Sequence, residues 1–291
     1  MDRSMETSFF VYRAYVERSF DQINIRVLTI NHCLDLKSIY EGSIDGQRIS
    51  LKPQPVEDSC PWQWAPGCLY NSYVLDGQAN IVKYNSPYIT LYRGKKKITI
   101  PLQRVPYRTK GAMAICVPPL YWYTNWAKMI FALEMWKAQG VVHVIIYHHS
   151  STKHVYKVLS QYQKEGFVTI VPWPSLPQTP FEDPNQSLYR LAHSLAHNDC
   201  VLRLNTEFGA LIDVDEVIMP RNHTLMSFVV ENFANSSVGA LLFKHHTLAL
   251  NPNYAGQNFS YDTLNFSGIW DATELEYEGP PKVFIKDVNF M

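Results

Sequence analysis

The sequence predicts an α/β protein with a mostly parallel sheet flanked by helices, preceded by a β-rich N-terminal region. Short β-branched or aromatic runs, separated by Gly, Pro, Asn and Asp, fill residues 1–108. From residue 109 onward, apolar runs alternate with segments of helical period. The chain has 291 residues, 46% of them hydrophobic and 18% charged, so it can bury a substantial core. We therefore expect two regions, residues 1–108 and 109–291.

The β-rich region is predicted from short runs with no helical period. These runs lie at residues 9–12, 25–30, 88–92 and 98–100. A basic run at 93–97 stands between the last two and is better explained as a solvated hairpin turn than as a binding patch. The formal net charge is zero, so the composition gives no sign of a nucleic-acid partner.

The second region shows the strand–helix alternation of a parallel sheet covered on both faces. Near-continuous apolar runs predict strands at 111–117, 141–147, 167–173, 210–215 and 238–244. Helical periodicity with Gly stops predicts helices at 126–139, 155–166, 185–205 and 225–233. In such a sheet, ligands bind beyond the carboxyl ends of the strands.

That rule makes the acidic stretch at 213–216 the leading candidate site. Asp213 and Asp215 come where an apolar strand ends, and on an extended backbone their side chains would point the same way. Such a pair can hold a hard divalent cation that bridges diphosphate oxygens. The alternative is a polar strand end that leads into a turn before Pro220.

A second acid, Asp199, lies on the apolar stripe of the helix predicted at 185–205. A carboxylate there needs a partner or a function, and Arg203, four residues later, would be a purely structural partner.

Histidines give a weaker signal. His193 and His197 have the spacing of two zinc ligands, but Ser194 stands where a metalloprotease motif has Glu, so ordinary histidines are favoured. His149 follows the second predicted strand and is a candidate for lining the site at the sheet edge, with a simple turn as the alternative.

Cysteines and sequons bear on the compartment. Five cysteines form no C-x-x-C pair, and Cys60 and Cys68 could close a short loop. Five N-x-S/T sequons mildly favour a secretory compartment. No signal peptide and no run of 18 apolar residues is present.

An ordered series of motifs resembles glycosyltransferase family 92 over about residues 9–290. The series comprises Val117-Pro-Pro-Leu-Tyr, Glu134-Met-Trp-Lys-Ala-Gln-Gly140, Val144-Ile-Ile-Tyr147, Tyr162-Gln-Lys-Glu-Gly166, Val171-Pro-Trp173, Asn198-Asp-Cys200 and Asp213-Val-Asp-Glu216. The resemblance implies a GT-A-like, Rossmann-related fold, a Golgi membrane protein, UDP-galactose as donor, Mn²⁺ as cofactor, and a glycan acceptor such as an N-glycan.

The resemblance also assigns residue roles. Asp213 and Asp215 would hold the metal, and the residues lining the donor would be Pro119, Tyr121, Tyr147, His149 and Asp213. Transfer with inversion needs a carboxylate to deprotonate the acceptor hydroxyl. Any acid of the segment 271–278, Glu276 among them, is a candidate for this base, and Asp199 is a further catalytic candidate from its place on the helical stripe.

Two departures from the family pattern shape the expectations. The turn after the second strand reads Tyr147-His-His-Ser150, where the family has an Asn. The chain stops at Met291, before a His expected to complete the metal site, and lacks the family's N-terminal anchor. We therefore expect a domain truncated at its C-terminus. The alternatives are a transferase of the same fold that uses another UDP-sugar, or an inactive glycan-binding relative.

Overall fold

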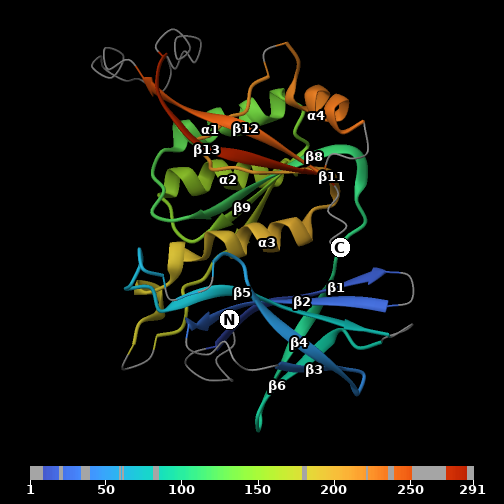
Figure 1. The fold of residues 1–291 in the computed structure, drawn as a ribbon. Helices are drawn as coiled ribbons and strands as arrows, with labels where there is room; N and C mark the ends of the chain where they lie inside the picture. The colour runs from blue at the N-terminus through green and yellow to red at the C-terminus, as the bar shows by residue number, and fades with distance from the viewer. Residues whose placement is uncertain are drawn as a thin grey trace.

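The computed structural model describes two bodies of secondary structure that pack against each other (Figure 1). The described residues are 9–19, 22–33, 40–58, 60, 62–80, 85–178, 182–220, 222–234, 239–250 and 273–286, and side chains are described only as far as 243. A barrel forms the lower body in Figure 1, and a six-stranded sheet with its helices forms the upper one.

The first body is a closed seven-stranded barrel in the order β1-β2-β5-β4-β3-β6-β7. Its strands are β1 (Phe9–Ser19), β2 (Gln22–His32), β3 (Tyr40–Ile44), β4 (Gln47–Pro55), β5 (Tyr70–Ala79), β6 (Tyr88–Arg93) and β7 (Lys96–Arg104). Parallel pairing of β1 with β7, with Ala14 opposite Leu102, closes it. The interior is filled by inward-facing aliphatic and aromatic side chains, among them Val27, Leu51 and Ile89.

The basic run at 93–97 is the turn of the β6–β7 hairpin, as predicted. Arg93 pairs with Lys96, and Gly94 takes the left-handed conformation (φ +59°) that tight hairpin turns require.

The second body is a mixed sheet in the order β10-β9-β8-β11-β13-β12. Its strands are β8 (Thr109–Leu120), β9 (His143–His148), β10 (Val168–Pro172), β11 (Thr206–Leu211), β12 (Ala240–Leu250) and β13 (Thr273–Lys286). The first four strands in this order are parallel, whereas β13 runs antiparallel to both β11 and β12.

Four α-helices in the described residues cover this sheet. They are α1 (Trp126–Ala138), α2 (Lys153–Lys164), α3 (His193–Arg203) and α4 (Leu225–Phe233). Asn125, Thr152 and Thr224 cap α1, α2 and α4 through side-chain acceptors. One apolar core includes buried residues of α1, α2 and α4 against the sheet, and another joins α3 to the sheet and to barrel strands. Figure 1 shows α3 between the sheet and the barrel.

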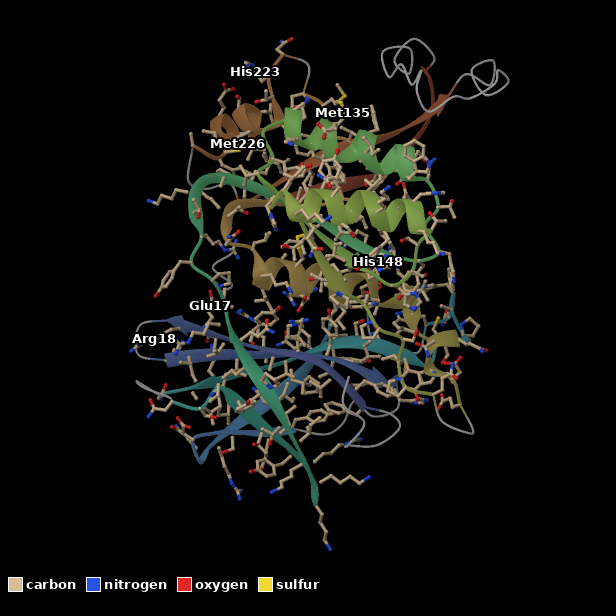
Figure 2. The ribbon with its side chains drawn as sticks, turned by 180° about the vertical axis from the view of Figure 1, so that it is seen from behind. Glu17, Arg18, Met135, His148, His223 and Met226 are labelled. Carbon is tan, nitrogen blue, oxygen red and sulfur yellow. A yellow bond between two sulfur atoms is a disulfide. The ribbon has the colours of Figure 1, made fainter. Side chains whose placement is uncertain are left out.

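The junction of α1 and α4 is a close backbone contact. Gly140 has φ +89°, and a Cβ built there would lie 2.7 Å from the Cβ of Met226. The Leu225 and Met226 amides donate to the Gln139 side chain and carbonyl. Figure 2 labels Met226 on α4 and Met135 on α1, at the end of the molecule away from the barrel.

The predicted fold class, a GT-A-like and Rossmann-related α/β sheet, was wrong. The structure is a closed seven-stranded barrel plus a small sheet with few helices, and antiparallel β13 interrupts the expected run of parallel strands. The sequence pattern predicted no strand at 273–286, whereas β13 lies there and is inserted between β11 and β12. The division of the chain into domains at residue 108 stays a prediction.

Local corrections concern one helix, one strand and the cysteines. The helix expected from 185 begins only at His193, after two 3₁₀ turns, η2 (Pro184–Gln186) and η3 (Tyr189–Ala192). The strand expected to reach Asp215 ends at Leu211. Disulfides join Cys33 to Cys60 and Cys116 to Cys200, so the expected Cys60–Cys68 loop is wrong and Cys68 is a free thiol.

No helix in the described residues is long and apolar enough to span a membrane.

Candidate functional site

A pocket opens where the parallel strands β8, β9 and β10 end. Each strand contributes the residues that directly follow it: Tyr121 and Trp122 after β8, His149 after β9, and the segment 173–176 after β10. The far wall comes from Ile30 of the barrel and from Asn185, Leu188 and Leu191. Figure 2 labels His148 at this end of β9. The pocket thus lies where parallel sheets usually bind ligands.

The pocket walls are aromatic rings held in place by hydrogen bonds. The rings of Tyr121 and His149 lie 4.5 Å apart, centroid to centroid. Trp173 Nε1 donates to the Tyr121 hydroxyl (3.1 Å), which donates to the Leu191 carbonyl (3.1 Å). His149 Nε2 lies 3.0 Å from Ser175 Oγ. Burial raises the pKa of Tyr121 and lowers that of His149, so both rings are neutral near pH 7.

The size and polarity of the pocket limit what it can bind. Its volume is about 130 Å³, and none of the residues that line it is Asp, Glu, Lys or Arg. An apolar cavity of about 150 Å³ holds one benzene molecule. The pocket therefore suits a single uncharged six-membered ring, and its walls carry no charged side chain to pair with a phosphate.

Trp122 stands at the edge of this pocket in a strained conformation. Its φ is +49°, its amide donates to Ser150 Oγ (2.8 Å), and its side chain is 72% exposed. A non-glycine residue held in this region costs free energy, and such residues cluster at ligand-binding sites. The geometry keeps an indole face open to solvent beside the pocket.

The acidic stretch follows β11 as a tight turn. The Glu216 amide donates to the Asp213 carbonyl (3.1 Å), and the Glu216 carboxylate accepts from the Asp213 amide (3.1 Å). The expectation that Asp213 and Asp215 lie on extended backbone is therefore wrong, because Val214 and Asp215 form the middle of a turn. Both acids still lie at the same sheet edge as the pocket.

Two basic side chains connect the turn to its surroundings. His193 is the first residue of α3, and its ring is stacked parallel to the Tyr121 ring with the centroids 6.5 Å apart. Burial lowers the pKa of His193, and the Asp213 charge offsets part of that lowering. Lys128 Nζ of α1 lies 3.7 Å from Asp215 Oδ2, with both side chains about half exposed. Burial and the Asp215 charge together raise the pKa of Tyr123 to about 12. His193 thus lies beside Tyr121 and within the electrostatic influence of Asp213 in the acidic turn.

The residues at the turn do not complete a cation site. Carboxylate oxygens are suitable ligands for Mn²⁺, but within the described part of the chain no three His, Cys, Asp or Glu side chains are grouped to hold a metal. Asp215 also faces the Lys128 ammonium group. Asp213 and Asp215 therefore do not fit a cation by themselves.

Asp199 is fully buried and surrounded by donors. Its carboxylate accepts from Tyr15 (2.7 Å), Tyr147 (2.6 Å) and Arg203 Nε (2.6 Å), and Arg13 Nε lies 3.0 Å away as an ion pair. The Arg203 partnership expected as the structural alternative is confirmed. Because both oxygens are engaged and none of the side chain is exposed, the contacts favour this structural role over a catalytic one.

The other predicted site residues are distributed around the pocket. Tyr147 is buried on β9 and belongs to the Asp199 cluster, and its hydroxyl does not line the pocket. Pro119 is buried in β8, at an irregularity in its pairing with β9. Glu276 lies on β13, outside the described side chains. Of the predicted donor residues, Tyr121 and His149 come together in the pocket.

Three residues of the site were missed by sequence reasoning. Trp122 and Trp173 directly follow strands, so the strand-end rule that selected Asp213 could have found them. His193 was treated as an ordinary histidine, and only the fold places it beside Tyr121. Asn185, a sequon residue, lines the pocket and exchanges two hydrogen bonds with the Leu176 backbone.

Comparison with known proteins gives a consistent family. The family model described as "Glycosyltransferase family 92" matches residues 111–291. A Caenorhabditis elegans glycosyltransferase family 92 protein is 26% identical over 222 residues, which cover 74% of this chain and 40% of that protein. A second one from the same organism is 27% identical over 122 residues, covering 40% of this chain and 24% of that protein.

Since the family model matches more than half of it, this chain belongs to glycosyltransferase family 92. The chain spans about two fifths or less of the length of these curated relatives.

Proposed function

We propose that this chain binds the nucleotide-sugar donor of a glycosyltransferase that moves a hexose from a UDP-sugar to a glycan. Family membership supports the reaction class. The single observation that carries the site is the position of an aromatic pocket, sized for one ring, beside the acidic turn at the edge of the parallel strands. The resemblance described above favours galactose as the transferred sugar.

The pocket is the proposed position of the uracil ring. An uncharged flat ring could stack on Tyr121 and His149 there. The diphosphate is charged, and burying it against walls without a charged side chain would be unfavourable. The acidic turn, with Lys128 beside it, lies at the next strand end and is the proposed diphosphate side. Lys128 is the proposed positive charge for the leaving group there, once its ion pair with Asp215 opens.

The chemical step we propose is an inverting displacement. The acceptor hydroxyl oxygen forms a bond to the anomeric carbon while the bond from that carbon to the diphosphate oxygen breaks. A carboxylate takes the hydroxyl proton. Glu276 remains the proposed base, because the saturated contacts of Asp199 leave it no way to reach an acceptor.

Dependence on Mn²⁺ is retained as a proposal, to be tested by binding. Isothermal calorimetry would measure UDP affinity with and without Mn²⁺ for the wild type and for Tyr121→Ala, Asp213→Asn and, as a surface control, Glu231→Gln. Loss of base stacking at Tyr121 should weaken UDP binding about tenfold or more in both conditions. Asp213→Asn should reduce only the part of the affinity that Mn²⁺ adds, and Glu231→Gln should bind as the wild type does.

Two results would reject the donor site. One is a wild type that binds no UDP with Mn²⁺ present, and the other is UDP binding by Tyr121→Ala and Asp213→Asn at wild-type affinity. Competition of UDP-galactose against UDP-glucose and UDP-N-acetylhexosamine would then identify the sugar.

A further inference from the structure

A second aromatic group lies on the barrel side of the pocket. It consists of Trp62 and Trp64, in the loop between β4 and β5, and Tyr189 of η3, and we call it the aromatic platform. Tyr189 stacks on buried Trp62 with ring centroids 3.9 Å apart and planes 18° from parallel. Trp64 is 67% exposed. None of these residues lines the pocket.

Several contacts hold the platform in place although its outer ring is exposed. Trp64 Nε1 donates to the Tyr189 hydroxyl (3.4 Å), which orients the indole. The loop below is tied by the Cys33–Cys60 disulfide, by the Cys68 amide bond to the Ala65 carbonyl (3.0 Å) and by the Leu69 amide bond to the Ser187 carbonyl (2.9 Å). An exposed indole held this way loses little conformational entropy when it binds a ligand.

A strained turn connects the platform to the pocket. Arg190, Leu191 and Ala192 are three consecutive non-glycine residues with positive φ. Tyr189, just before them, stacks on the platform, while Leu191 lines the pocket and accepts from Tyr121. In Figure 1 this segment, drawn in yellow, lies beside the loop that precedes β5. Strain of this kind persists where surrounding contacts hold a binding surface in position.

Polar side chains adjoin Tyr189, the residue of the platform that lies next to Arg190 in the chain. Arg190 is 63% exposed and pairs with Glu57 (3.5 Å), which also accepts from Ser194 of α3. A flat aromatic face bordered by hydrogen-bonding groups is complementary to a pyranose, whose C–H face is apolar and whose edge carries hydroxyls. The platform has no such complementarity to a nucleotide diphosphate, which would need a surplus of positive charge.

We propose that the aromatic platform binds a neutral hexopyranose of the acceptor glycan, with the Trp64 indole against the C–H face of the sugar. That this glycan is the acceptor rests on the proposed function, whereas the binding of a sugar by the platform does not. A glycan held at Trp64 lies across η3 from the donor pocket, so the platform anchors a sugar unit remote from the reacting hydroxyl.

The test is binding to an immobilised array of neutral glycans ending in galactose, N-acetylglucosamine, mannose or fucose. Wild type is compared with Trp64→Ala, with Trp64→Phe, which keeps a ring face, and with Tyr107→Ala, which removes a fully exposed aromatic ring from the segment between the two bodies. Trp64→Ala should lower affinity about fivefold to tenfold, as expected for the loss of one aromatic contact. Trp64→Phe should restore part of the affinity, and Tyr107→Ala should match the wild type.

Other readouts separate the possible failures. UDP affinity should be the same in the wild type and the three variants. If the wild type binds no UDP, the donor site is rejected, and the proposal for the aromatic platform is unaffected. The platform is rejected if the wild type binds no glycan on the array, or if Trp64→Ala binds as the wild type does. It is also rejected if Trp64→Ala changes only the oligomeric state measured by light scattering, which would indicate a protein-binding surface.

Discussion

Asp199 illustrates how one buried charge is stabilised in this molecule. The carboxylate is completely inaccessible, yet two arginines and two tyrosine hydroxyls surround it. A buried ion is tolerated only when it is paired and hydrogen-bonded in this way. Since Arg13 and Tyr15 come from β1, Tyr147 from β9 and Arg203 from α3, the same contacts join the barrel to the sheet body.

Removing this charge should strongly destabilise the fold. Asp199→Asn keeps the shape but leaves two guanidinium groups without a counter-ion, so we expect a loss of about 3 to 5 kcal/mol in the free energy of unfolding. Urea unfolding measures it, with Asp215→Asn as the control. Asp215 is half exposed and ion-paired at the surface, so its loss should change stability by less than about 0.5 kcal/mol. Equal effects of the two substitutions would contradict the role given to Asp199.

The tyrosines around Asp199 predict a loss of stability at alkaline pH. Burial, and then the Asp199 charge, raise the pKa of Tyr147 and Tyr15 well above the usual value and that of Tyr12 to about 12. Unfolded tyrosine titrates near pH 10, so above that pH the unfolded chain binds fewer protons than the folded one. The stability from these groups is therefore complete below about pH 10 and is lost as pH rises through the folded pKa values.

Urea unfolding at intervals between about pH 9 and pH 12 would measure this dependence. The decline should be shallower in Tyr147→Phe, by up to about 1.4 kcal/mol per pH unit, which is the contribution of one proton. An identical slope in the wild type and the variant would show that Tyr147 does not take part.

The sequence could predict single site residues from the strand-end rule and from the family resemblance. His149 and Asp213 each follow an apolar strand, whereas Tyr121 came from the resemblance, and the structure places all three at one sheet edge. Whether they bind the donor stays a prediction. The burial of Asp199 was visible in its helical stripe, but its contacts with Arg13 and Tyr15 join residues more than 180 positions apart, which no local pattern encodes.

At the scale of elements, apolar runs and Gly stops predicted most strands and helices of the second region. The helix expected from residue 185 failed because tertiary contacts hold its first part. The Ser187 carbonyl accepts from the amides of Leu69 and Tyr70, and Leu188 forms a bridge with Tyr70. These contacts fix residues 187 and 188 against β5, and the left-handed turn that follows delays the helix to His193.

The two disulfides should differ in how much they contribute to the free energy of unfolding. Cys116–Cys200 links β8 to α3 across 84 residues of sequence, whereas Cys33–Cys60 spans 27. In the chain-entropy model each disulfide adds about 3 to 5 kcal/mol to the free energy of unfolding. The disulfide that closes the longer loop adds about 1 kcal/mol more than the other. Urea unfolding of the two double Cys→Ala variants measures the difference. A larger loss on removing Cys33–Cys60 would contradict the ranking, and thiol labelling of the native wild type should modify only Cys68.

At the scale of the whole molecule, the closed barrel was beyond prediction from the sequence. Short strands were visible, but closure depends on pairing Ala14 with Leu102, at opposite ends of the region. Likewise, the insertion of β13 between β11 and β12 is a non-local choice that a pattern of alternating strands and helices cannot show. The periodicity of a segment reports which face is buried, and it does not report which neighbour buries it.

The buried cluster at Asp199 also constrains how parts of this protein can be exchanged with those of relatives. The family model begins at residue 111, after the last barrel strand. This boundary suggests that the barrel could be exchanged for that of another protein. Asp199 lies inside that match, while Arg13 and Tyr15 lie outside it. A chimera that takes its barrel from another protein must therefore bring a guanidinium and a hydroxyl to the same two positions. Otherwise Asp199 keeps Arg203 but loses the guanidinium and the hydroxyl that Arg13 and Tyr15 of the replaced barrel supplied.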